Sequence, residues 1–155
     1  MLRIVMTGEV ADLALEVNSV LREYLSIQNR IFKFSLKKAL GFFRPDPLEA
    51  SEAVVPLLDR LEKVRIGIKG LSPSDESEEG RFLMVLRAYS RAMSEAMESF
   101  RDLCVKLERH KKDRKYRKGP YLEDMRSFQE METRYLEIGL KLNELKKSIS
   151  EESEK

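Results

Sequence analysis

Apolar residues recur along most of this chain at alternating steps of three and four positions. The clearest stripe lies within residues 81–118 and consists of Phe82, Leu86, Tyr89, Met93, Ala96, Phe100, Leu103 and Leu107. Such steps bring side chains to one face of an α-helix, and a sustained heptad rhythm is typical of helices that pack along their whole length. We therefore predict one long helix here, capped by Ser72 or Ser74 and ending within residues 111–118.

Three further stripes with the same spacing predict three more helices, over residues 7–40, 46–70 and about 121–150. The second of these has the clearest start. Asp46 can cap the helix with its side chain, and Pro47 suits the first helical position, where a backbone N–H is not needed. Glycines follow or end the first two helices, as is common at helix C-termini.

Four helices with one apolar stripe each, joined by short links, predict an all-α fold. We expect an antiparallel up-down-up-down four-helix bundle in which helices 1, 3 and 4 are long and helix 2 is shorter. Residues 1–150 are expected to form a single domain, followed by a frayed acidic tail over residues 151–155. Because helix 2 is short, part of the apolar seam lies beyond it. The 71–80 loop, the N-terminal arm or a second copy of the chain can cover that part, and we favour a second copy, in a homodimer.

The composition bounds the class of protein. Charged residues make up 36% of the 155 residues, above the usual ~25%, while asparagine and glutamine number only five, a combination typical of thermophile proteins. The one cysteine, Cys104, excludes an internal disulfide and falls on an apolar stripe, so we expect a buried, inert thiol. No apolar run is long enough to cross a membrane, which predicts a cytoplasmic protein.

The net charge is only +2, but it is unevenly distributed. Residues 106–118 hold eight basic and two acidic residues, and residues 24–45 hold no acidic residue at all. In the predicted bundle the ends of helices 1 and 3 share one pole, so these two segments meet there. One interpretation of this basic pole is a surface for nucleic acid, with Tyr116 available to stack on a base. The other is a solvated helix end that keeps the protein in solution.

The candidate residues for nucleic-acid or other anion binding are the basic residues of both segments together with the tyrosine. They are Lys33, Lys37, Lys38, Arg44, Lys106, Arg109, Lys111, Lys112, Arg114, Lys115, Tyr116, Arg117 and Lys118.

A group of phenylalanines lies among the basic residues of the first segment and gives it a wide apolar arc. They are Phe32, Phe34, Phe42 and Phe43. These residues are candidates for docking a partner protein, or a membrane surface. The alternative is that they close the end of the core and the contact between two copies.

Metal chemistry has little support in this sequence. The chain has one histidine, His110, so neither the Glu-x-x-His pairs of a di-iron bundle nor a zinc site can be assembled, and we predict no metal and no cofactor. An all-carboxylate magnesium site at Glu76, Glu78 and Glu79 is the remaining option, although helix capping explains these residues equally well.

Nucleophilic catalysis is not indicated either, since Cys104 and His110 are six positions apart and do not share a helix face. Glu132 lies near the fourth stripe, where the rhythm slips. We expect a carboxylate at the seam's edge that reaches water, and the alternative is a half-buried general acid with a raised pKa.

Three functions follow from these patterns. The leading hypothesis is a non-catalytic interaction or assembly protein that binds itself or a partner helix through exposed apolar seam. The first alternative is a nucleic-acid-binding subunit that uses the basic pole. The second is a carboxylate- and magnesium-dependent hydrolase, and we expect that the protein is not an enzyme.

Overall fold

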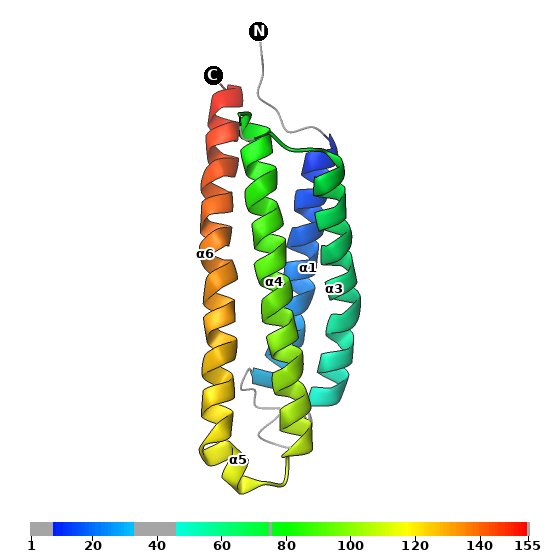
Figure 1. The fold of residues 1–155 in the computed structure, drawn as a ribbon, viewed down its shortest axis with the longest axis vertical. Coiled ribbons are helices and arrows are strands. Elements are labelled where there is room, and N and C mark those ends of the chain that lie inside the picture. The colour runs from blue at the N-terminus through cyan, green and yellow to red at the C-terminus, as the bar shows by residue number, and fades with distance from the viewer. Residues whose placement is uncertain (1–7, 33–45, 75, 155) are drawn as a thin grey trace.

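The computed structural model describes residues 8–32, 46–74 and 76–154. Its elements are α1 (Gly8–Phe32), α3 (Pro47–Gly70), α4 (Glu78–Arg109), the short α5 (Arg114–Lys118) and α6 (Pro120–Glu154). The described residues contain no β-strand, so the predicted all-α class is confirmed. Four long helices lie side by side, and α5 joins α4 to α6 at one end (Figure 1).

Helix α4 is the centre of this arrangement. Figure 1 shows α6 on one side of α4 and α3 on the other, with α1 behind, and α1 and α4 run opposite to α3 and α6. No Cα atom of α1 lies within 8 Å of one of α6 in the described residues. Large side chains close that side instead, because the rings of Phe32 and Phe128 lie 5.7 Å apart and those of Tyr24 and Tyr135 lie 6.4 Å apart.

The apolar stripes meet along the inside of the helices. On α4 the whole predicted stripe is buried except Leu107, which is half-buried. Phe100 lies near the middle of the aromatic core, 5.8 Å from the rings of Tyr24, Phe32 and Phe128. The stripes of the described helices are therefore satisfied within one chain, as the burial of apolar surface requires.

Two predicted helix starts have different outcomes. Asp46 caps α3 as predicted, because its Oδ1 atom accepts a hydrogen bond from the N–H of Glu49 at 3.1 Å. The prediction that Ser72 or Ser74 caps the third helix is wrong. The cap is Ser77, whose Oγ atom accepts from the N–H of Gly80 at 2.9 Å.

Gly80 explains why the cap lies further along the chain. A Cβ atom at this position would meet the carbonyl oxygen of Ser74 at 1.7 Å, so the preceding loop folds directly over the first turn of α4. Only a glycine allows that close approach, and residues 72–74 are thereby held outside the helix.

The helix ends also differ from the expected ones. Helix α4 ends at Arg109, before the predicted region 111–118, and α5 is a separate helix with Asp113 as its cap. Helix α6 continues to Glu154, past the predicted end near residue 150. The predicted continuation of the first helix beyond Phe32 falls in residues 33–45, outside the described residues.

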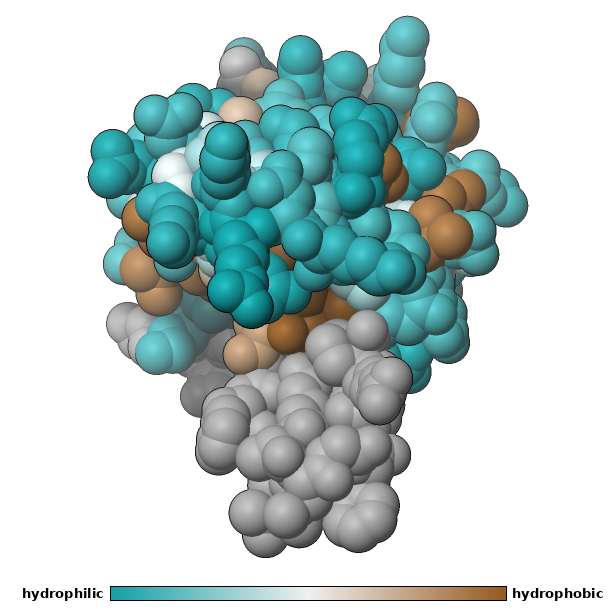
Figure 2. All heavy atoms as spheres, turned by 90° about the horizontal axis from the view of Figure 1, so that it is seen from below, coloured by the Kyte–Doolittle hydropathy of each residue, from teal (hydrophilic) through white to brown (hydrophobic). Residues whose placement is uncertain are grey.

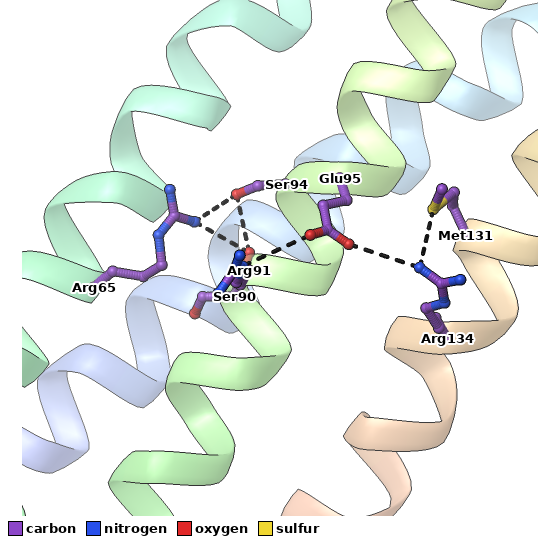
Figure 3. A network of polar contacts seen from close by, with 7 residues as sticks. All are labelled: Arg65, Ser90, Arg91, Ser94, Glu95, Met131 and Arg134. Carbon is purple, nitrogen blue, oxygen red and sulfur yellow. Dashed lines mark hydrogen bonds and ion pairs between the residues drawn. The ribbon is translucent and has the colours of Figure 1, made fainter.

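Polar contacts fix the register of α3 between its neighbours. Arg60 pairs with Glu16 and Glu23 of α1. On the other side, Arg65 donates to the Oγ atom of Ser94 at 2.7 Å, as Figure 3 shows, and the Nε atom of Arg101 donates to the carbonyl of Ser51 at 3.2 Å. These contacts hold α3 and α4 at one relative height along most of their shared length.

Candidate nucleic-acid interface

Residues 106–118, which we call the basic turn, comprise the last residues of α4 and the segment that reverses the chain between α4 and α6. Helix α4 stops at Arg109, and Asp113 then starts α5 by accepting the N–H of Lys115 at 3.0 Å. Gly119 ends α5, and Pro120 begins α6. Cap residues and a glycine–proline pair are common helix boundaries, so the break has a local cause.

Tyr116 anchors the basic turn to the rest of the molecule. Its side chain is 5% exposed, its ring stacks on His110 at 4.6 Å, and its hydroxyl donates to Oδ2 of Asp124 in α6 at 2.9 Å. Burial, followed by the hydrogen bond to Asp124, raises the pKa of the Tyr116 hydroxyl above its usual value. One inward-pointing tyrosine in a five-residue helix leaves the rest of that helix to face solvent.

The basic side chains of the turn are accordingly exposed, except for the half-buried Lys106. Two of them have carboxylate partners, since Lys106 lies 3.1 Å from Asp124 and Lys111 lies 2.9 Å from Glu108. The other six make no ion pair or side-chain hydrogen bond with the described residues. They are Arg109, Lys112, Arg114, Lys115, Arg117 and Lys118.

The nearby carboxylates are engaged in structural contacts. Asp113 caps α5, Asp124 holds Tyr116 and Lys106, and Glu108 pairs with Lys111. Hydrophilic residues cover most of the described surface at this end of the molecule, as Figure 2 shows. The surface therefore keeps a large excess of positive charge, because its acidic groups are engaged in the cap of α5 and in contacts with Tyr116, Lys106 and Lys111.

The structure corrects one candidate residue and leaves others undescribed. Tyr116 is not presented for stacking on a base, because its ring is buried against His110. Lys33, Lys37, Lys38 and Arg44 lie outside the described residues, as do Phe34, Phe42 and Phe43. Phe32 is half-buried and packs on Phe100 and Phe128, so it belongs to the aromatic core.

Sequence reasoning missed the anchor that shapes this site. Asp113 is a typical cap residue inside a basic run, and this was the available signal that α5 starts a new helix. The contact between Tyr116 and Asp124 joins different helices, and no spacing rule within one helix predicts it.

A second polar cluster lies between α1 and α6. Glu132 accepts hydrogen bonds from the hydroxyl of Tyr24 at 2.6 Å and from Nε2 of Gln28 at 2.8 Å. Burial raises the pKa of the Glu132 carboxyl, while the hydrogen bonds that it accepts act in the opposite direction. Of the two interpretations of Glu132, the half-buried carboxylate with a raised pKa is the one that the structure shows.

The described residues form neither a reactive-cysteine site nor a metal site. Cys104 is buried, and burial raises the pKa of its thiol to about 12, which keeps the thiol protonated at neutral pH. Among the described residues, no three side chains of His, Cys, Asp or Glu are grouped so that they would hold a metal ion. No described helix carries an apolar stretch of the length that a bilayer requires.

Comparison with known proteins identifies no relative of this chain. The chain matches none of the protein-family models, curated proteins or solved structures with which it was compared.

Proposed function

We propose that this protein binds the phosphate backbone of nucleic acid through the basic turn. The observation that carries the proposal is that six exposed cations of this turn have no carboxylate or hydrogen-bond partner among the described residues. The proposal takes the helices as the predicted antiparallel up-down-up-down bundle, in which the ends of α1 and α4 share one pole.

Helix capping alone is a weak explanation for this charge. Cations at a helix C-terminus interact favourably with the helix dipole by about 0.3–1 kcal/mol, but the effect is limited to the last turn. Six unpaired cations exceed that need, and they repel one another at a cost. A polyanion relieves this repulsion, and its binding releases counterions into the solvent.

The anchored geometry of α5 supports the same function. Because Tyr116 and Asp113 hold α5 in place, its cations are presented without the ordering cost that a flexible tail would incur on binding. The two aromatic rings of the turn stack on each other, with Tyr116 buried and His110 half-buried, so neither ring lies fully open on the exposed face. We therefore expect binding to phosphates without base preference.

The two other hypotheses have less support. Docking through an apolar seam requires that part of the stripe be exposed to solvent. The stripes of the described helices are instead largely buried within the chain. A magnesium-dependent hydrolase requires grouped carboxylates, and the described residues offer no such group.

The test is fluorescence anisotropy of labelled duplex and single-stranded DNA and RNA, titrated at several salt concentrations. The variant replaces Lys112, Arg114, Lys115 and Lys118 together by glutamine, which removes charge but retains helix propensity. If six phosphates are contacted, log K should fall with log salt with a slope of about −5, and the variant should reduce the slope by about 3–4.

The matched control replaces four exposed cations away from the turn by glutamine, namely Arg22, Lys141, Lys146 and Lys147. This control changes the net charge equally and should retain nearly all the affinity and most of the slope. Equal losses in both variants, or no binding by the wild type at low salt, would show that the basic turn is only a solvated helix end.

A further inference from the structure

The outer face of α3 and α4 combines apolar side chains with segregated charge. A shallow hollow of about 600 Å³ lies between these helices. Ile66 and Met84 border it with 64% and 45% of their surface exposed, and neither belongs to the hydrophobic core. In Figure 3 this face includes Arg65 on α3 and Arg91 on α4.

On α4 this face is a second stripe, separate from the one that forms the core. Its exposed members recur at helical spacing and are Met84, Arg87, Arg91, Glu95, Glu98, Asp102 and Val105. The cations all precede the midpoint of the stripe and the carboxylates all follow it, with one apolar residue at each end. Exposed charge on a helix is common, but this order is unusual. When a second copy of the stripe runs antiparallel to the first, each cation faces a carboxylate.

The symmetry is clear when residues are paired about the midpoint between Ser94 and Glu95. Arg87 and Asp102 lie equally far from this point, as do Arg91 and Glu98, and Met84 and Val105. On α3 the midpoint between residues 60 and 61 relates Ile66 to Val55 and Lys69 to Glu52, which are also exposed.

The two midpoints lie at one level along the molecule. Arg65 of α3 reaches α4 at Ser94 and at the carbonyl of Ser90, and Arg101 of α4 reaches α3 at Ser51. Interpolation between these contacts sets residues 60–61 beside residues 94–95 to within about one helical turn, or about 5 Å. A single two-fold axis can therefore relate both sets of pairs.

We infer that the α3–α4 face binds a second copy of this chain, antiparallel, about a two-fold axis that passes near Ser94 and Glu95. In this dimer Arg87 and Arg91 of each copy face Asp102 and Glu98 of the other, and Met84 faces Val105. Lys69 faces Glu52 on α3 in the same way. Such an interface is isologous, since each pair occurs twice.

The charged groups are available for this pairing. The side chains of Arg87, Asp102, Lys69 and Glu52 make no ion pair or hydrogen bond with described residues. Among the residues that the structure describes, Arg91 and Glu98 pair only with neighbours on their own helix, Glu95 at 3.7 Å and Arg101 at 3.5 Å. Exposed pairs of that kind contribute little, so they can be exchanged for pairs across the interface.

Two like-charge juxtapositions remain among the described residues of this face. Glu95, beside the axis, approaches the same residue of the other copy, and Arg134 at 4.0 Å offsets its charge. Glu62 of one copy also approaches Asp59 of the other. Lys63 lies 3.1 Å from Asp59 and offsets its charge.

The residues from Met84 to Val105 span roughly 30 Å, and two helices are roughly 20 Å wide, which gives on the order of 600 Å² per copy. This area is at the low end for specific interfaces, so the dimer should be weak and sensitive to salt.

Sedimentation equilibrium at low salt tests the inference with two charge-reversal variants. One carries Arg87→Glu and Arg91→Glu, and the other carries Glu98→Arg and Asp102→Arg. Each variant alone brings like charges together in the dimer and should associate at least tenfold more weakly than the wild type. An equimolar mixture restores an opposite charge at all four positions, so heterodimers should form at about wild-type affinity.

The control reverses Lys141 and Lys147 on α6 to glutamate and should dimerise like the wild type. Circular dichroism melts establish that every variant folds. A wild type that stays monomeric at several hundred micromolar would overturn the inference, as would reversal variants that still dimerise. Loss of the dimer without recovery in the mixture would overturn the antiparallel pairing.

Discussion

At the scale of single residues, Glu132 is an acidic side chain held in a half-buried position, where its charged form is poorly solvated. A carboxylate that loses water is disfavoured in its charged form, and two hydrogen bonds from Tyr24 and Gln28 compensate only in part. The cluster nevertheless provides a direct polar link between α1 and α6, whose backbones do not approach closely. Glu132 therefore adds specificity to this contact at some cost in stability.

This environment predicts a pH dependence of folding. Because the pKa of Glu132 is raised in the folded state, the folded protein binds this proton more tightly than the unfolded chain. Its contribution to stability is present below the unfolded pKa and is lost as the pH rises toward the folded pKa. Glu132→Gln should therefore melt at a higher temperature than the wild type at pH 7 but not at pH 4.

Thermal denaturation followed by circular dichroism at both pH values measures this difference. Glu130→Gln, at an exposed position of the same helix, is the matched control and should show no such pH-dependent gain. A Glu132→Gln variant that is less stable than the wild type at pH 7 would mean that the hydrogen bonds outweigh desolvation of the carboxylate.

At the scale of elements, α5 shows how a short helix can be specified by its two ends and one side chain. Five residues are too few for a stable isolated helix. The cap at Asp113 and the burial of Tyr116 stabilise this short helix, and both contacts exist in the absence of a ligand.

Capping of α5 can be separated from charge by two substitutions of Asp113. Both Asp113→Ala and Asp113→Asn remove one negative charge, but only asparagine retains a capping side chain. We expect Asp113→Ala to destabilise this turn by about 0.5–2 kcal/mol and to bind duplex DNA more weakly than Asp113→Asn. Anisotropy titrations and amide hydrogen exchange over residues 111–118 measure the two effects. Equal affinity of the two variants would show that order in α5 is not needed for binding.

At the scale of the whole molecule, the two proposals have a joint consequence. In an antiparallel dimer the basic turns lie at opposite ends, because each turn follows α4 away from the common midpoint. Residues 95–109 of α4 lie between the midpoint and the end of that helix in each copy, so at ~1.5 Å per residue the two ends are about 45 Å apart. Each can then reach a different nucleic-acid molecule.

The dimer should therefore bridge two duplexes. With separate donor-labelled and acceptor-labelled DNA duplexes, the wild type should give energy transfer between them at protein concentrations that favour the dimer. The Arg87→Glu, Arg91→Glu variant should still bind one duplex but give no transfer, and mixing it with the Glu98→Arg, Asp102→Arg variant should restore transfer. Transfer by the first variant alone would contradict this joint prediction.

Much of the fold was predictable because helical periodicity is a local property. The stripe from Phe82 to Leu107 and the cap at Asp46 were sufficient to place two helices, since both signals act within a few residues. The end of α4 was not predictable in the same way. Its basic run has good helix formers, yet α4 stops at Arg109, and the separate helix α5 then turns Tyr116 inward to Asp124 of α6.

The sequence by itself determined the helical class, the core-facing residues and the concentration of positive charge in residues 106–118. All of these depend on residue type and spacing along one chain segment. Tertiary structure alone decided which charges are paired, which way Tyr116 points, and that the half-buried Glu132 accepts a hydrogen bond from Tyr24. Those features depend on contacts between residues far apart in the chain, such as Tyr24 with Glu132, and they form only once the helices have packed.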